Sequence, residues 1–193
     1  GIPLADDYFL DEPELALLED KMPSPESSVQ GISQMSFKKK KRIINADVLI
    51  VGAGISGMQS ALDIADKGYK VVIIDKTSTI GGSMVKLDKT FPTNDCSICT
   101  AAPKMVELAR HPNIELITYA ELNKLEGKRG DFTAQIWKKT KYVDPDKCTG
   151  CNDCAEVCPV DVVSSFDEKI STRKAIYIEF PQAVPIVYTI DKE

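Results

Sequence analysis

The densest chemistry in the sequence is a run of four cysteines towards its C-terminal end. Cys148, Cys151, Cys154 and Cys158 have the spacing C-x2-C-x2-C-x3-C, followed directly by a proline. This spacing lets three thiolates converge on one cluster while the fourth points towards another. A zinc site is the alternative, but it usually needs two separated pairs or a histidine, and the sequence has one histidine, His111. The run therefore predicts a 4Fe-4S cluster.

A second pair, Cys96 and Cys99, has the spacing C-x-x-C. Half of a metal site, two buried thiols and a redox dithiol are all compatible with one such pair. We include both residues among the candidate metal ligands. No cysteine occurs in the first 95 residues and four are crowded together, which favours metal binding over disulfides. This usage predicts a reducing, cytoplasmic compartment.

A glycine-rich turn lies between an expected strand and an expected helix. Gly52, Gly54 and Gly57 fit G-x-G-x-x-G, where the first permits a tight turn, the second admits a pyrophosphate and the third allows close packing of helix on strand. Ile55 and Ser56 start the helix, whose N-terminal N–H groups favour an anion. The alternative is that the glycines only close the turn. The context favours a bound dinucleotide.

The acid Asp75 ends the next expected strand, 23 residues after Gly52. A carboxylate there can bind a ribose and would repel a 2′-phosphate, so FAD or NAD fits better than NADP. A Gly-Gly pair follows, as in many two-domain flavoproteins, and this resemblance favours FAD. The further candidate cofactor-binding residues are Lys76, Gly81, Gly82, Ser83 and Met84.

These residues require an α/β scaffold to position them. Short apolar runs predict parallel strands, apolar residues at helical spacing predict helices, and two glycines predict a hairpin turn. Pro103 suits the first turn of the second helix. The expected strands are 48–51, 69–74 and 114–118, the expected helices are 55–65 and 102–110, and the added hairpin pairs 122–126 with 132–137.

The N-terminal part has a different composition. Residues 1–29 carry eight acids, one base and four prolines, which indicates an extended arm, with room for a short helix over 12–20. The basic run 38–42 is typical of a solvated linker. We therefore divide the chain into an acidic and basic arm over 1–45, the first part of a Rossmann-like domain over 46–140 and an incomplete cluster module over 141–193.

Composition excludes several function classes. The 193 residues carry a net charge of −5, so nucleic acid is not an expected partner. The longest stretch without a charge, 48–62, is too short for a membrane span, and no export signal is visible. With a single histidine we expect no Ser-His-Asp or Cys-His nucleophile, and we assign no catalytic side chain.

Five segments, 82–84, 87–99, 110–114, 147–151 and 180–185, together resemble the iron-sulfur flavoprotein of heterodisulfide reductase, the HdrA-like family. The resemblance runs from about Asp47 to the end. It implies a Rossmann-like FAD domain similar to thioredoxin reductase, interrupted by a ferredoxin-like iron-sulfur insert, in a cytoplasmic electron-transfer complex. In this family the FAD is associated with electron bifurcation.

We therefore expect an FAD and 4Fe-4S electron-transfer subunit of such an oxidoreductase complex, with other subunits and electron donor and acceptor proteins as partners. The alternative is a flavin-free iron-sulfur relay or assembly subunit. The later strands of a complete flavin domain are absent, so we expect a fragment or a shortened form that needs partners for activity. Residues 190–193 repeat the opening of 143–146, which predicts a second cysteine run after Glu193 to complete the cluster of Cys158.

Overall fold

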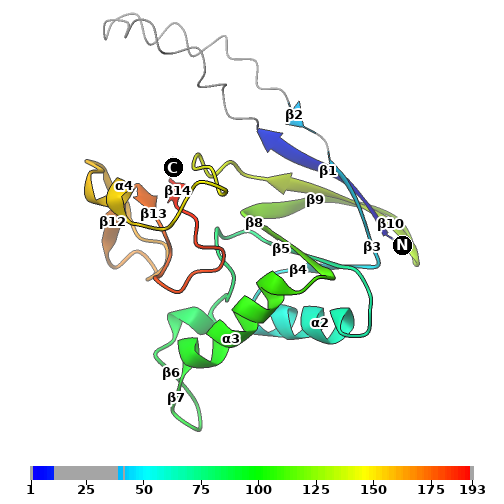
Figure 1. Cartoon of the computed structure of the whole chain (residues 1–193), viewed down its shortest axis with the longest axis horizontal. Helices are drawn as coiled ribbons and strands as arrows, with labels where there is room; N and C mark the ends of the chain where they lie inside the picture. The colour runs from blue at the N-terminus through cyan, green and yellow to red at the C-terminus, as the bar shows by residue number, and fades with distance from the viewer. Residues whose placement is uncertain (1, 11–38, 41, 192–193) are drawn as a thin grey trace, which may run out of the picture.

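A computed structural model describes residues 2–10, 39–40 and 42–191 of the chain. Its centre is a three-stranded parallel sheet in the order β4-β5-β8 (Figure 1). The sheet forms because apolar runs can be buried on both faces, and all five residues of the middle strand are buried. The three predicted strands are confirmed as β4 (Val48–Val51), β5 (Val71–Asp75) and β8 (Ile114–Thr118).

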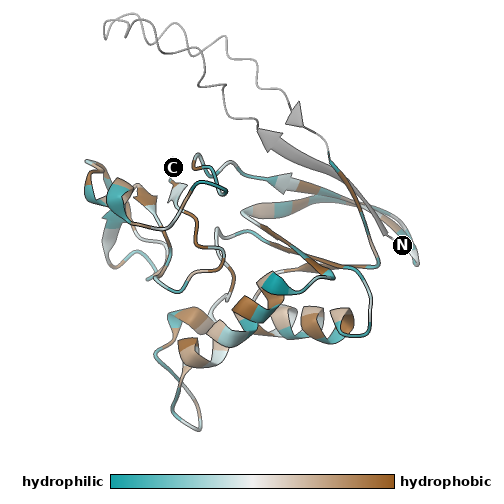
Figure 2. Ribbon diagram, in the orientation of Figure 1, coloured by the Kyte–Doolittle hydropathy of each residue, from teal (hydrophilic) through white to brown (hydrophobic). Residues whose placement is uncertain are grey.

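Two helices, α2 (Ile55–Ala65) and α3 (Ser97–Arg110), cover one face of this sheet (Figure 1). Met58 and Leu62 of α2 and Met105 of α3 are buried against Ile73 of β5. Figure 2 shows apolar residues on the parallel strands and on the helices that pack against them. The predicted helix over 55–65 is confirmed.

A second sheet, in which one strand pair is parallel and three are antiparallel, covers the other face of the parallel sheet. The predicted hairpin is confirmed, and Val72 and Ile74 of the central strand pack against Ala134 and Ile136 of its second strand. The strand order of this layer is β2-β1-β10-β9, with β3 paired to β1. Its strands are β1 (Ile2–Leu10), β2 (Lys39–Lys40), β3 (Ile43–Ala46), β9 (Ala120–Lys128) and β10 (Asp131–Lys138). The helix expected over 12–20 lies outside the described residues.

The second helix begins earlier than expected. The prediction of a start at residue 102, with Pro103 in the first turn, is wrong, because α3 begins at Ser97 and contains the proline in its interior. Two contacts set this start, and the first reaches ten residues back along the chain. The hydroxyl of buried Ser97 donates to the carbonyl of Leu87, and the sulfur of Cys96 caps the helix by accepting the N–H of Cys99.

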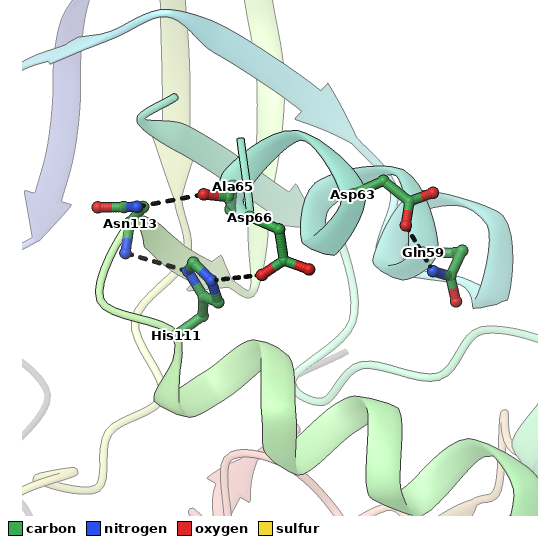
Figure 3. Close-up of polar contacts among 6 residues, drawn as sticks. All are labelled: Gln59, Asp63, Ala65, Asp66, His111 and Asn113. Atoms are coloured by element: carbon green, nitrogen blue, oxygen red, sulfur yellow. Dashed lines mark hydrogen bonds and ion pairs between the residues drawn. The ribbon is translucent and has the colours of Figure 1, made fainter. Parts of the chain in front are cut away.

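The single histidine, His111, forms contacts that connect two turns of the fold. His111 Nε2 lies 3.2 Å from Asp66 Oδ1, and its Nδ1 accepts the N–H of Asn113 at 3.2 Å (Figure 3). The Asn113 side chain in turn donates to the carbonyl of Ala65 at 3.2 Å. These contacts tie the end of α2 to the turn between α3 and β8.

After residue 140 the chain contains little regular structure, as the composition indicates. It nevertheless returns to the main core: Phe180 and Ala183 are buried in the cluster formed by the two helices. The N–H of Ile80 donates to the carbonyl of Val184 at 2.9 Å. The elements here are α4 (Asp153–Glu156), β11 (Asp161–Val163), β12 (Thr172–Lys174), β13 (Ile176–Tyr177) and β14 (Thr189–Ile190).

Three short elements connect β5 to α3. They are a 3₁₀ helix, η3 (Met84–Lys86), and the two-stranded ribbon of β6 (Lys89–Thr90) and β7 (Asp95–Cys96). Within the part of the chain that the structure describes, no helix has the length and apolar character needed to cross a membrane.

Candidate cofactor sites

The glycine-rich turn has the backbone geometry that its sequence suggests. Gly52 adopts a φ of +101°, which side chains disfavour, and its N–H donates to the carbonyl of Ile74 at 2.8 Å. A Cβ on Gly57 would collide with the carbonyl oxygen of Gly52, so this glycine brings the helix close to the strand. A Cβ on Gly54 would meet no atom within 4 Å. Space beside Gly54 is therefore open to a ligand.

Asp75 holds this turn in place. Its buried carboxylate accepts the N–H of Ala53 at 2.6 Å through Oδ2, and the N–H and hydroxyl of Thr77 at 2.9 and 2.7 Å through Oδ1. A carboxylate offers about four acceptor sites, so capacity remains for a ribose hydroxyl. The contact with Ala53 has no signal in the sequence.

The second glycine pair lies directly beside the first turn. Gly81 donates its N–H to the carbonyl of Ala53 at 2.9 Å and forms a parallel bridge with Gly54. Gly82 has a φ of +59°, and a Cβ there would lie 2.9 Å from the Cα of Gly54. Side chains at this position would push the two loops apart.

These loops border a cleft of about 590 Å³. Six of the expected cofactor-binding residues line it, namely Gly52, Gly54, Asp75, Lys76, Gly82 and Ser83. The other five, Ile55, Ser56, Gly57, Gly81 and Met84, are not among the lining residues, and Met84 packs against the core. The cleft thus brings together the glycine turns and the acid that would contact a pyrophosphate and a ribose, so the residues present fit an adenine dinucleotide.

Part of the cleft lining comes from the C-terminal part of the chain, which the sequence analysis did not predict. Phe166, Glu179 and Phe180 line it together with Lys86. The Lys86 ammonium lies 5.6 Å from the centroid of the Phe166 ring. Burial raises the pKa of Glu179, and the charges of Arg173 and Lys86 oppose this shift. Only the tertiary fold brings these positions to the cleft.

Three cysteines of the run share one electrostatic environment. Burial raises the pKa of Cys154, and the neighbouring Cys151 and Cys148 raise it further. Buried Tyr188 donates its N–H to Cys148 Sγ at 3.5 Å and its hydroxyl to Asn152 Oδ1 at 2.7 Å. Burial and the same three thiols raise the pKa of Tyr188. Tyr188 thus contacts Cys148 directly and lies near enough to the other two thiols for their charges to affect it.

The fourth cysteine of the run has different neighbours. Backbone hydrogen bonds to Ile176, then to Val160, lower the pKa of Cys158, and the charge of Lys174 contributes in the same direction. Its thiol donates to the carbonyl of Val160 at 3.6 Å. Its surroundings differ from those of the other three, as expected for a cysteine directed to another cluster.

The pair Cys96 and Cys99 is exposed at the end of the β6–β7 ribbon and the start of α3. The hydrogen bond from Cys99 lowers the pKa of Cys96, whereas the contact with Cys96 raises the pKa of Cys99. Among the described residues no three His, Cys, Asp or Glu side chains are gathered around one point as for a single metal ion. Within these residues the structure therefore neither unites this pair with the run nor gathers three cysteines of the run around one point.

Comparisons with known proteins find matches to two parts of the chain. Residues 47–138 match a family model described as "FAD dependent oxidoreductase", and residues 141–164 match one described as "4Fe-4S binding domain". The chain is 59% identical over 142 residues to a CoB--CoM heterodisulfide reductase iron-sulfur subunit of Methanopyrus kandleri, covering 74% of this chain and 22% of the relative. This chain is homologous to a segment of the HdrA-like proteins.

Other relatives agree with this assignment. The match to the corresponding subunit of the "H(2)/formate:CoB-CoM heterodisulfide,ferredoxin reductase" of Methanococcus maripaludis has 54% identity over 153 residues, 78% of this chain and 23% of the relative. Its counterpart in the "Ferredoxin:CoB-CoM heterodisulfide reductase" of Methanosarcina mazei is 40% identical over 186 residues, 95% of this chain and 23% of the relative. The chain spans less than a quarter of the length of these relatives.

The comparisons confirm the predicted cofactors, FAD and a 4Fe-4S cluster, and the predicted α/β fold class with a ferredoxin-type module. The thioredoxin reductase of T. acidophilum has a TM-score of 0.42, with 23% identity over 47% of this chain and 30% of its own. This structural likeness covers less than half of either chain.

Proposed function

We propose that this chain forms the FAD and 4Fe-4S electron-transfer part of a heterodisulfide reductase-like oxidoreductase complex. The observation that carries the proposal is that one cleft is lined both by the glycine turns and by Phe166, Glu179 and Phe180 of the cluster module. A dinucleotide bound there would touch both parts of the chain. Its partners are other subunits and proteins that donate and accept electrons, in the cytoplasm.

In this proposal the cofactors would supply the redox chemistry. A bound FAD can accept or donate one or two electrons, whereas a 4Fe-4S cluster transfers one electron at a time. The chain's own residues position them. Gly54 leaves room for the pyrophosphate, Gly82 lets the second loop lie against the first, and Asp75 accepts from the ribose. The thiolates of one cluster are Cys148, Cys151 and Cys154. Cys158 binds a further cluster, and Cys96 and Cys99 form half of another metal site.

The competing function is a flavin-free relay or assembly subunit. Anaerobic purification of the chain, followed by a visible spectrum, iron analysis and extraction of flavin, separates the two. We expect both flavin and iron at whole-number ratios to protein. Iron without flavin, after addition of FAD, would leave the relay as the function.

The cluster assignment is tested with Cys151→Ser. We expect this variant to lose the iron of about one cluster per chain while still binding FAD, since the flavin cleft contains no cysteine among its lining residues. The variant Lys147→Gln, in the same loop but without a thiol change, is the matched control. Unchanged iron in Cys151→Ser would contradict the ligand assignment.

A further inference from the structure

Lys141 is a largely buried cation at the junction between the sheet and the cluster module. Its ammonium donates to the carbonyl of Ser78 at 3.1 Å and to the hydroxyl of Thr118 at 3.0 Å. Ser78 lies between Thr77 and Thr79, which both line the dinucleotide cleft. Lys141 is therefore anchored directly behind that cleft.

The backbone of Lys141 contacts the other side of the junction. Its carbonyl accepts the N–H of Ile190 in β14 at 3.1 Å. A few residues on, the N–H of Cys148 donates to the carbonyl of Asp144 at 3.0 Å, which begins the cluster loop. A cavity of about 390 Å³ is lined by Lys141, Asp144 and Val187 among others. Residues 188–190 thus contact both sides, because Tyr188 donates its N–H to Cys148 Sγ at 3.5 Å while Ile190 binds the Lys141 backbone.

The charge of Lys141 is surrounded by neutral acceptors. Among the described residues no aspartate or glutamate forms an ion pair with it, and both of its hydrogen-bond acceptors are uncharged. Burial lowers its pKa to about 8, and Lys138 acts in the same direction, whereas the nearby Cys148 favours the charged form. A buried cation is costly unless an anion compensates it, and a cluster bound at Cys148 would supply such an anion.

A cluster ligated by thiolates is such an anion, and it becomes more negative on reduction. An ammonium at a partly dry junction stabilises the more negative form most, because Coulomb attraction is weakly screened there. We propose that the positive charge of Lys141 raises the reduction potential of the cluster held by Cys148, Cys151 and Cys154. The inference rests on the cluster assignment in the proposed function.

The test compares three variants of the anaerobic chain with its cofactors bound, using redox titration of the cluster followed by electron paramagnetic resonance. Lys141→Gln removes the charge but keeps a hydrogen-bond donor for Ser78 and Thr118, and Lys141→Arg keeps the charge. Lys147→Gln is the matched control, because Lys147 adjoins Cys148 in the sequence but has an 86% exposed side chain. Iron content is measured for each protein.

We expect Lys141→Gln to retain iron and to shift the cluster's reduction equilibrium towards the oxidised form by about tenfold, or about 59 mV for one electron. Lys141→Arg and Lys147→Gln should stay near the wild-type potential. An unchanged potential in Lys141→Gln, or an equal shift in Lys147→Gln, would overturn the proposal.

If Lys141→Gln loses its iron, the iron content and potential of Lys141→Arg distinguish a role of the charge from a role in packing. Wild-type iron content and potential in Lys141→Arg would support the role of the charge. If Lys141→Arg also loses its iron, or has an altered potential, Lys141 acts through packing alone. A wild-type chain that binds no iron would instead contradict the cluster assignment itself, so the two failures are distinguishable.

Discussion

At the scale of single residues, two glycines of one turn should respond differently to substitution. Gly54 has open space beside it and a φ of −73°, so Gly54→Val should fold normally yet place a branched side chain in the cleft. We expect FAD affinity to fall by at least about 100-fold, about 2.7 kcal/mol. Fluorescence titration of the apoprotein with FAD measures this, and unchanged affinity would rule out FAD at this turn.

Gly57→Ala is the matched comparison, since the added Cβ would meet the carbonyl of Gly52. Overpacking of this kind costs about 1–3 kcal/mol of unfolding free energy. Urea unfolding should therefore show a lower midpoint for Gly57→Ala than for Gly54→Val. Equal midpoints would show that helix and strand can separate without cost.

The exposed thiols give a second prediction at this scale. In the iron-free chain Cys96 should be alkylated faster than Cys99 below pH 9, because a lowered pKa gives more thiolate and a raised pKa gives less. With iron bound under anaerobic conditions, both should be protected until a chelator is added. Mass spectrometry of timed samples follows both sites, and rapid labelling before chelation would identify them as free thiols.

At the scale of elements, a half-buried ion pair joins β12 to the end of β14 in the C-terminal part of the chain. Arg173 of β12 pairs with Asp191 at 2.8 Å, with side chains only 14% and 23% exposed, and its guanidinium lies 3.3 Å from the ring centroid of Tyr177. Asp191→Asn would remove the ion-pair partner of a half-buried charge, at a cost of up to about 3 kcal/mol. Denaturant unfolding measures the loss.

The control for this prediction is the exposed pair Lys124 and Glu126, whose side chains are 56% and 59% exposed. Glu126→Gln should change the unfolding free energy by less than about 1 kcal/mol, because exposed ion pairs are screened by water. A loss in Asp191→Asn no larger than in Glu126→Gln would show that water reaches Arg173.

The elements also show how far the sequence could predict the structure. Val71–Asp75 was predictable as a strand because its apolar run has no other stable arrangement than burial on both faces. The start of α3 was not, because it depends on contacts of Ser97 with residues ten positions earlier in the chain. The cleft-lining role of Phe166 and Glu179 was equally hidden, since no local pattern records which distant loop a side chain will face.

At the scale of the whole molecule, removal of iron should affect the C-terminal part unevenly. The cluster loop has few buried residues, so hydrogen exchange in peptides covering 148–163 should accelerate when iron is chelated. Peptides covering 180–187 should stay protected, because Phe180 and Ala183 belong to the main core and Val184 is hydrogen bonded to Thr79. Simultaneous acceleration of both would indicate a single cooperative unit.

The return of Phe180 and Ala183 into the helix-side core limits how this protein can be dissected. A chain cut after Thr140 would remove a buried aromatic ring, worth about 1.5–3 kcal/mol, and would leave the N–H of Ile80 without its acceptor on Val184. Ile80 directly precedes the Gly81 and Gly82 loop that borders the cleft. Removing residues 141–193 would therefore damage the proposed flavin cleft, and such a truncated chain would report on a broken cleft and not on an isolated FAD domain.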